Sequence, residues 1–559
     1  MSASSKKKLR KELNAAALTE KQRAERKEAR KLKAYSISFI AIMLAVVLTF
    51  VSVLAYTGIK NSGILEKNTI AAIVNGKQLN TVEFNYFFRD AISSTYSQWY
   101  EQYGDSTSNM VSWLLNLDLK KPLDQQAHSD GGTWADRFLQ TALKDAKETY
   151  KLASLAEQAG HKLTEDEQSE LDNSLYYTTM YASLYGYKNA DEYLKVLYGP
   201  GSDEESFKAY MTLKALATSY YTAKADTFEY EDSDLRGYEE GKYDNYSSFT
   251  YSWYYVNYQS YLPKAEPEKS EDGATTPTST TKKEYTDEEI AAAKEQAKAD
   301  AEALAKVLDL EEFQKAVADL PVNESSTTAK VTTSTSVLYP TIPEVYAKWL
   351  AEEGREENNI TFIADETTST DDNGIETSNP NGNYYVVMFQ SRNDNLRLLA
   401  NVRHLLVAFE GEKDKDGNYT QAQKDAAKAE AEKLLKEWQD GAATEDSFAA
   451  LVKEKTDDSG SKSTGGLYED ISAGSNYVEN FRNWAIDDTR KAGDTGIVDT
   501  EYGYHIMYYV GDGDISYRDA MITNDMLAED MQEWFKEIME DVSAELKNTS
   551  RVDTSVSMT

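Results

Sequence analysis

The third quarter of this chain is repeated in the fourth, and this internal repeat constrains the fold more than any other feature. Tyr285 to Glu289 opens an Ala-rich segment of helical pattern, and Tyr419 to Gln423 opens a matching one. In both, a threonine is followed three residues later by Glu or Gln, which predicts a capping box. The register continues beyond the helix, because two aromatic pairs share the same separation in the sequence: Phe313 with Phe448, and Trp349 with Trp484.

Each copy begins and ends with a run of strand-like residues. The opening runs are Phe249 to Tyr258 and Val402 to Phe409, and the closing runs are Tyr384 to Phe389 and His505 to Val510. We therefore expect two copies of one α+β unit. The first copy is lengthened by two polar segments, Pro263 to Lys283 and Asp365 to Gly382, which we predict to be flexible and solvated.

A basic arm and an apolar run open the chain. Met1 to Lys33 holds twelve Lys and Arg against four Glu, and the whole run from Ala34 to Ile59 contains no charged side chain. About 20 apolar residues span a bilayer as a helix, and basic flanks stay in the cytoplasm. We expect a single-pass anchor in the cell membrane, with a cytoplasmic N-terminus and the bulk of the chain extracytoplasmic. A cleaved signal peptide is the alternative, although Tyr56 to Ile59 is a poor cleavage site.

The charge balance and the lack of cysteine exclude several classes of protein. The 60 Lys and Arg and 95 Asp and Glu give a formal charge of -35, which repels the phosphates of nucleic acids. Nucleic acid is therefore not an expected partner. Without cysteine, neither a disulfide framework nor a lipid-modified cysteine is possible.

Helical patterns dominate the residues after the predicted anchor. A short strand, Ile70 to Asn75, precedes helical patterns over Val82 to Ile92, Trp134 to Ala159, Glu165 to Tyr185 and Ser206 to Ala223. We predict a mainly helical domain here, and a last helix, Ile522 to Leu546, whose apolar stripe packs back onto it. The many tyrosines between Tyr176 and Tyr258 are either half-buried core residues or an amphipathic surface for peptide segments.

Two of the four histidines direct attention to the second copy. His404 and His505 lie in its first and last strand-like runs, which can be neighbours in a sheet. Five signals occur in the order that is characteristic of parvulins: Val402 to Val407, Asp458 seven residues before Gly465-Gly466-Leu467, Phe481, Gly493 to Gly496, and Gly503 to Met507. The segment from about Asn401 to Gly511 resembles this family. The whole chain more loosely resembles the PrsA-type and SurA-type foldases, in which a helical chaperone domain accompanies parvulin modules.

The resemblance implies a four-stranded antiparallel sheet wrapped by helices, with a proline-binding pocket on the sheet. His404 and His505 would be the two core histidines, and Asp458 would lie beside the isomerised bond. Phe481 would contact the proline ring. Where the family commonly has Met four residues before this aromatic residue, the chain has Tyr477, which we assign with Phe481 to substrate binding.

The same residues have other interpretations. The histidines can form a buried polar pair that only stabilises the sheet. A metal site of His404, His505 and Asp458 lacks a local spacing motif. A serine or cysteine hydrolase is disfavoured because the chain has no Gly-x-Ser-x-Gly elbow and no cysteine. We expect neither a metal nor another cofactor.

The sequence thus predicts an α+β protein with six parts. They are a basic cytoplasmic arm (1–33), a transmembrane anchor (34–59), a helical chaperone-like domain (60–240), a degenerate parvulin-like domain (241–395), a parvulin isomerase domain (396–513), and a C-terminal helix and tail (514–559). The first copy is expected to be inactive, since alignment places Trp253 and Tyr385 where the second has His404 and His505. The predicted function is an extracytoplasmic peptidyl-prolyl cis-trans isomerase and chaperone for unfolded or partly folded exported polypeptides. The alternative is a non-catalytic holdase chaperone with inactive parvulin domains.

Overall fold

The computed structural model describes residues 63–103, 117–118, 121–263, 285–322, 329–370, 376–415 and 417–554. The chain divides into two compact units, one of Met1–Tyr230 with Asp525–Thr559 and one of Glu231–Asn524. The basic arm, the predicted anchor and nearly all of the Pro263 to Lys283 insert lie outside the described residues. Within the described ranges, no helix is both long enough and apolar enough to cross a membrane.

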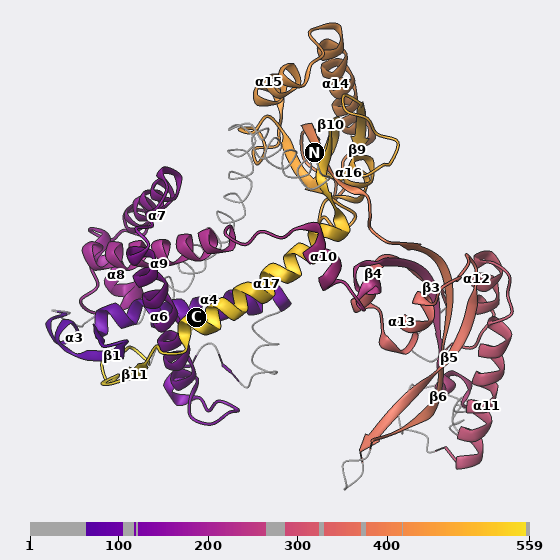
Figure 1. Ribbon diagram of the computed structural model, residues 1–559, viewed down its shortest axis with the longest axis horizontal. Coiled ribbons are helices and arrows are strands. Elements are labelled where there is room, and N and C mark those ends of the chain that lie inside the picture. The colour runs from indigo at the N-terminus through magenta and orange to yellow at the C-terminus, as the bar shows by residue number, and fades with distance from the viewer. Residues whose placement is uncertain are drawn as a thin grey trace, which may run out of the picture. The chain divides into compact units, whose positions relative to one another are not determined.

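The first unit is mainly helical, as predicted (Figure 1). Its elements before residue 230 are α3 (Ile64–Asn68), β1 (Ile70–Val74), β2 (Lys77–Asn80), α4 (Thr81–Tyr103), the short 3-10 helix η3 (Leu123–Gln125), α6 (Trp134–Gln158), α7 (Glu165–Leu184), α8 (Ala190–Tyr198) and α9 (Glu204–Ala225). Three α4 residues at helical spacing, Phe84, Phe87 and Phe88, are almost fully buried at the centre of the core. Thr133 and Asp136 form a capping box that starts α6.

The C-terminal residues complete this unit. The helix α17 runs over Tyr517–Met539, and Trp534, Phe535 and Ile538 pack against Leu152, Ala153 and Ala217. This contact confirms that the apolar stripe packs back onto the helical part. The predicted extent of the helix to Leu546 is wrong, because Ala544–Leu546 form the strand β11. Its backbone pairs with β1, with Ala72 opposite Leu546, so these residues satisfy their hydrogen bonds across a sheet and not along a helix.

The second unit contains two modules with the same order of elements (Figure 1). The first module has β3 (Ser248–Val256), η5 (Tyr258–Tyr261), α11 (Asp287–Leu304), α12 (Leu310–Ala318), β4 (Thr332–Leu338), η6 (Tyr339–Thr341), α13 (Glu344–Ala351), β5 (Ile360–Thr370) and β6 (Glu376–Asn393). The second module has β7 (Leu398–Ala408), α14 (Gln421–Asp440), α15 (Glu445–Lys455), β8 (Leu467–Ile471), α16 (Glu479–Ala485), β9 (Thr495–Asp499) and β10 (Gly503–Ser516). The helix α10 (Asp232–Tyr238) and η4 (Tyr243–Tyr246) precede them.

The two sheets share one topology, which confirms the predicted pair of α+β units. The strand orders are β4-β3-β6-β5 and β8-β7-β10-β9, all antiparallel, so the first and last strands of each module lie side by side at the centre. Both predicted capping boxes are present, at Thr286 with Glu289 and at Thr420 with Gln423. The registers also agree, because Val256 pairs with Tyr384 as Val407 pairs with Tyr504.

The predicted flexible loop from Asp365 to Gly382 is instead largely a β-hairpin. The strands β5 and β6 continue through it, with pairs from Glu366 with Pro380 to Thr370 with Glu376. Threonine is β-branched and favours extended backbone, and this segment contains several threonines. The prediction of a flexible loop is wrong because it relied on the polarity of this segment. Two polar strands can pair with each other at the end of a sheet.

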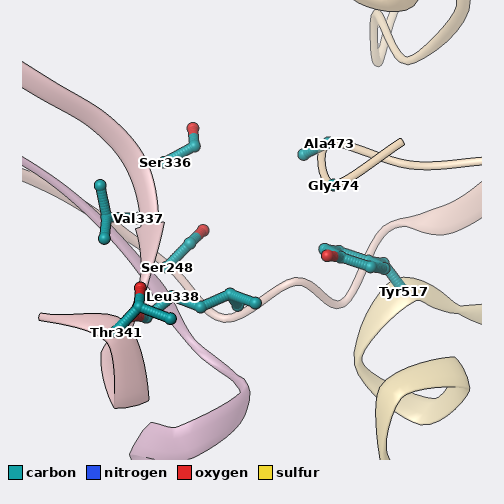
Figure 2. A pocket seen from close by; sticks show the side chains of 8 residues that line it. All are labelled: Ser248, Ser336, Val337, Leu338, Thr341, Ala473, Gly474 and Tyr517. Atoms are coloured by element: carbon teal, nitrogen blue, oxygen red, sulfur yellow. The ribbon is translucent and has the colours of Figure 1, made fainter. Parts of the chain in front are cut away.

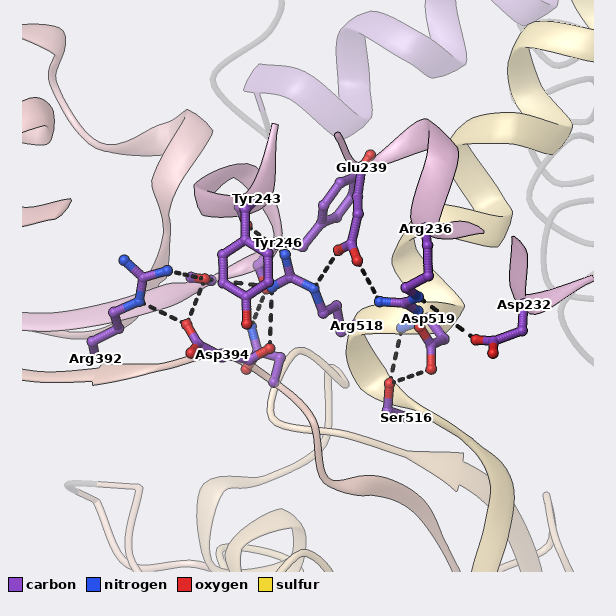
Figure 3. Close-up of polar contacts among 12 residues, drawn as sticks. Asp232, Arg236, Glu239, Tyr243, Tyr246, Arg392, Asp394, Ser516, Arg518 and Asp519 are labelled. Atoms are coloured by element: carbon purple, nitrogen blue, oxygen red, sulfur yellow. Dashed lines mark hydrogen bonds and ion pairs between the residues drawn. The ribbon is translucent and has the colours of Figure 1, made fainter. Parts of the chain in front are cut away.

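A buried arginine holds the linker between the modules (Figure 3). Arg518 is completely buried, and its Nε donates to Glu239 Oε2 at 2.7 Å while Nη2 donates to the Tyr243 carbonyl at 2.6 Å. Its guanidinium also lies 3.7 Å from the centre of the Tyr243 ring. The Arg518 backbone N–H donates to the carbonyl of Asn395, a linker residue that is itself 2% exposed. The linker is therefore fixed to the residues on both sides of it.

Candidate active site

The central strands of the second module bring two histidines together. In the β7–β10 register, His404 pairs with Met507 and Leu406 pairs with His505, so both histidines are on the same face of the sheet. The Nδ1 atoms of His404 and His505 are 3.0 Å apart. Both side chains are buried, with 3% and 6% of their surface exposed. The predicted juxtaposition of the two histidines is confirmed.

Asp458 extends this pair on the side of His404. Its Oδ2 lies 3.1 Å from His404 Nε2 and accepts from Ser461 Oγ at 2.5 Å, and its Oδ1 accepts from the Gly460 N–H at 3.0 Å. Burial opposes ionisation of this carboxyl group. The hydrogen bonds from His404 and Ser461 outweigh that effect and lower the pKa of Asp458 below its usual range. Asp458 is therefore an ionised acceptor at neutral pH.

The hydrogen bonds locate one proton of this group. An ionised Asp458 only accepts, so His404 Nε2 carries a proton. One proton lies between the Nδ1 atoms of His404 and His505, and His505 Nε2 lies 3.0 Å from Thr500 Oγ1. Burial and the neighbouring His404 lower the pKa of His505 to about 3. His505 is therefore neutral at pH 7.

Aromatic rings cover the other side of the histidine pair. Phe481, on α16, is 3% exposed, and its ring centre lies 5.2 Å from that of His404 and 5.4 Å from that of His505, with both pairs edge-on. Tyr477 lies 5.5 Å from Phe481, and Tyr468 on β8 lies 5.0 Å from His404. Burial raises the pKa of both tyrosines, so their hydroxyl groups stay protonated. The site thus combines the hydrogen-bonded Asp458, His404 and His505 with an aromatic cluster of Phe481, Tyr477 and Tyr468.

Comparison with protein-family models identifies this part of the chain. The family described as Rotamase, PPIC-type PPIASE domain, matches residues 404–511. Residues 404–511 form a PpiC-type parvulin domain. Its match begins at His404 and includes Asp458, Phe481 and His505.

Solved structures similar to the chain include PrsA proteins and SurA-like chaperones. PrsA, a peptidylprolyl isomerase from Bacillus anthracis, is 21% identical with a TM-score of 0.17. The match covers 26% of this chain and 59% of the PrsA chain. PrsA from Bacillus subtilis is 14% identical with a TM-score of 0.28, covering 77% of this chain and 96% of its own. A SurA-like chaperone from Campylobacter jejuni is 23% identical with a TM-score of 0.15, covering 26% of this chain and 53% of its own.

These likenesses are partial. The chain spans 59% and 50% of the length of the PrsA proteins from Bacillus anthracis and Bacillus cereus. Every TM-score is below 0.5, so they establish no common arrangement of the whole chain. The comparison with curated proteins finds no matching sequence.

Two glycines of the parvulin domain allow the site to form. Gly465 and Gly466 have φ values of +68° and +74°, in the left-handed region that disfavours other residues. A Cβ atom on Gly466 would lie 2.1 Å from the His404 carbonyl oxygen. The Gly466 carbonyl accepts from the His404 N–H at 2.9 Å, so the pair of glycines positions the strand that carries the first histidine.

All five predicted site residues of the parvulin domain, His404, Asp458, Tyr477, Phe481 and His505, lie in this one cluster. Sequence reasoning missed Ser461, Tyr468 and Thr500, which contact Asp458, His404 and His505. A serine three residues after Asp458 in a loop is a usable signal, because such short polar spacings often form local hydrogen bonds. In the part of the chain that the structure describes, no group of three or more His, Asp or Glu is arranged to hold a metal ion.

Proposed function

We propose that this protein is a parvulin-type peptidyl-prolyl cis-trans isomerase that assists the folding of exported polypeptides. The observation that carries the proposal is the row of Asp458, His404 and His505 beneath Phe481, inside a segment that matches the PpiC-type family.

We further propose that residues 34–59 anchor the chain in the cell membrane, with the remainder extracytoplasmic. External protease on intact cells should then digest the chain after about residue 60 and spare the basic arm.

The chemistry needs no covalent intermediate. The barrier to rotation about a peptide bond, about 18–20 kcal/mol, comes from lost amide resonance. A site that binds the twisted amide better than the planar one is therefore sufficient for catalysis. Phe481 and Tyr477 form an apolar seat for the proline ring and lower the local dielectric, which weakens the solvation of the planar, more polar amide.

We propose different roles for Asp458 and for the two histidines, based on their hydrogen bonds and burial. Asp458 accepts hydrogen bonds from His404, Ser461 and Gly460 within the protein, so we assign it to orienting and fixing the His404 ring. The two histidines are almost enclosed, and both rings lie edge-on to the Phe481 ring. Their proposed role is to hold polar ring atoms in fixed positions beside Phe481, where these atoms interact with the rotating amide.

A protease-free isomerisation assay on a peptide with one X-Pro bond tests this proposal. The full chain with His404→Asn and His505→Asn should lose about a hundredfold in kcat/KM, as expected when preorganised polar groups are removed. His128, in the first unit, provides the control, and His128→Gln should retain parental activity. A double variant with parental activity and an intact far-ultraviolet circular dichroism spectrum would refute the catalytic assignment.

We also propose that the first module is a degenerate parvulin-like domain. Because Val256 and Tyr384 pair as Val407 and Tyr504 do, Trp253 and Tyr385 correspond to His404 and His505. Their ring centres are 6.4 Å apart. Tyr346 precedes Phe481 by the same separation as the other aromatic pairs of the repeat, and it lies 5.5 Å from Tyr385. An aromatic seat therefore persists while the histidines do not. Substantial residual activity in a folded double histidine variant would show either that this module is active or that the histidines are only structural, and assaying the isolated first module would tell the two apart.

A non-catalytic holdase is the second candidate, and one observation favours it. On α7, Tyr176, Tyr177 and Leu184 are 64%, 44% and 69% exposed, which is unusual for large apolar side chains on a folded surface. Such a surface suits weak binding of varied unfolded segments. The holdase proposal requires that the parent chain suppresses aggregation of an unfolded protein while the X-Pro peptide isomerises at its uncatalysed rate.

A further inference from the structure

Two cavities lie between the modules of the second unit. The smaller, of about 290 Å³, is lined by Ser248, Ser336, Val337, Leu338, Thr341, Ala473, Gly474 and Tyr517. The larger, of about 630 Å³, is lined mainly by the linker 392–398 and by residues 471–473, and it shares Ala473 and Tyr517 with the smaller one. Figure 2 shows Leu338 and Tyr517 pointing toward each other from opposite sides, with the Ala473 to Gly474 turn beside them.

The walls of this cleft are fixed. The linker carbonyls of Asp394 and Asn395 accept hydrogen bonds from Arg518 on α17. The Asn395 side chain donates to the Tyr246 carbonyl and accepts from Ser248 Oγ on β3 of the first module. Gly474 lies against Tyr517 so closely that a Cβ atom would be 1.9 Å from the tyrosine hydroxyl oxygen. The cleft is therefore a shaped feature of this unit, unlike the gap that a flexible linker leaves between two domains.

The strand at one wall lacks the usual protection of a sheet edge. Of the outer strands that the structure describes, β2, β11, β5, β8 and β9 each contain at least one charged residue, whereas β4, Thr332–Leu338, contains none. Charged residues on edge strands normally prevent pairing with other chains. Ser336 adopts φ +51°, where a β-bulge turns its side chain toward the cavity (Figure 2). Such bulges often re-aim side chains beside functional sites.

The charges that line the larger cavity are already paired. Arg397 Nε is 2.7 Å from Asp488, and Arg392 Nε is 2.6 Å from Asp394. An occupant therefore meets no unpaired charge from these four residues. The formal charge of -35 on each chain opposes a second copy as the occupant.

The turn that lines the cleft is followed closely in the sequence by a residue of the candidate active site. Ala473 and Gly474 line the cleft, and Tyr477, three residues after Gly474, packs on Phe481. We propose that this cleft is a subsite for an extended, uncharged segment of client polypeptide that flanks the isomerised proline. This inference rests on the proposed isomerase function and adds the part of the substrate that short peptides lack. The segment lies beside β4 and places an apolar side chain between Leu338 and Tyr517.

Substrate length and charge test the subsite in the full chain. The substrates are a tetrapeptide with one Ala-Pro bond, the same peptide extended on either side by six alternating Val and Thr residues, and versions extended by six alternating Glu and Thr residues. We expect one neutral extension to lower KM at least tenfold, equivalent to about 1.4 kcal/mol, and the acidic extensions to give no gain. Equal KM values for the tetrapeptide and both neutral extensions would overturn the inference.

The second experiment blocks the cleft with a large side chain. Thr341 lines the smaller cavity and is exposed, so Thr341→Trp fills it without disturbing the core. The ratio of KM values for short and extended peptides should fall to less than about twofold in Thr341→Trp and stay at the parental value in Thr332→Trp, because Thr332 is exposed on β4 outside both cavities. The ratio is internal to each variant, so partial unfolding cancels. A parental ratio in Thr341→Trp would refute the assignment.

The remaining outcomes are also decisive. If no peptide is isomerised, the proposed function fails, and fluorescence anisotropy with a labelled proline-free Val and Thr peptide still tests the cleft. Binding of that peptide that is lost in Thr341→Trp would support the subsite. Dimerisation in sedimentation that Thr341→Trp abolishes would make the cleft an interface between copies and overturn the inference. Peptide binding that occurs only after deletion of residues 264–284 would show that the chain itself fills the cleft, and would also overturn it.

Discussion

Replacing Gly466 by alanine should damage the parvulin domain more than the same change at another left-handed glycine. Gly466 and Gly493 have φ values of +74° and +93°, so alanine costs about 1–2 kcal/mol of backbone strain at both positions. They differ in their surroundings. A Cβ atom at Gly466 meets the His404 oxygen at 2.1 Å and the His404 nitrogen at 3.0 Å, whereas at Gly493 nothing lies within 4 Å.

The close contact at Gly466 determines how much more stability Gly466→Ala loses than Gly493→Ala. The His404 oxygen must move by about 1.3 Å to reach the 3.4 Å of ordinary contact, and this movement breaks the 2.9 Å hydrogen bond between the His404 N–H and the Gly466 carbonyl. A lost hydrogen bond with a buried unsatisfied group costs about 1–3 kcal/mol. We expect Gly466→Ala to destabilise the second module by about 2–4 kcal/mol more than Gly493→Ala, once the displaced strand is included.

Hydrogen exchange in increasing urea is the appropriate assay, because a chain of two units does not unfold in a single two-state step. The amides of β7 and β10 report the second module separately from the rest of the chain. Isomerase activity of folded Gly466→Ala should also fall, since His404 moves away from His505. Equal exchange in the two alanine variants would refute the close-approach argument.

Two other perturbations test the buried polar groups. Lowering the pH from 7 to 5 should cost the second module about 2 kcal/mol, because His505 has a folded pKa of about 3 and an unfolded value near 6.5, so only the unfolded chain gains a proton in this range. The loss, measured from hydrogen exchange of the β7 and β10 amides in urea, begins near pH 6.5 and should be absent in His505→Gln; equal pH dependence in parent and variant would contradict it. Replacing buried Arg518 with methionine should destabilise the second unit by about 3 kcal/mol, because Glu239 loses its 2.7 Å partner. Adding Glu239→Gln should restore part of this stability, and no recovery in the hydrogen exchange of the second unit in urea would argue against the ion pair.

Much of the site was predictable because its signals are local or periodic. His404 and His505 were found because strand-like runs at the two ends of one repeat become neighbours when the repeat forms a closed unit, and β7 and β10 are indeed paired. The capping boxes at Thr286 and Thr420 depend on residues three positions apart, so the sequence alone defines them. The same locality made the helices of the first unit predictable.

The features that the sequence did not reveal depend on distant partners. Arg518 reads as an ordinary surface arginine, and only its contacts with Glu239 and Tyr243, which are far away in the sequence, make it a buried one. Residues Ala544–Leu546 continue a helical pattern, yet β1 supplies them with backbone partners. Tyr468 and Thr500 joined the candidate site through the sheet and the β9–β10 turn, which no short motif records.

The pairing of β11 with β1 has a consequence for the order in which this protein assembles. The strand β1 lies between β2 and β11, and Val552 contributes to the same core, so the first unit cannot be completed until the last described residues have been made. The second unit, Glu231–Asn524, contains all of its own strands and can be complete earlier. The common order, in which the N-terminal domain folds first during synthesis, is therefore reversed. The core around Phe84, Phe87 and Phe88 therefore lacks Ala544, Leu546 and Val552 until the end of synthesis.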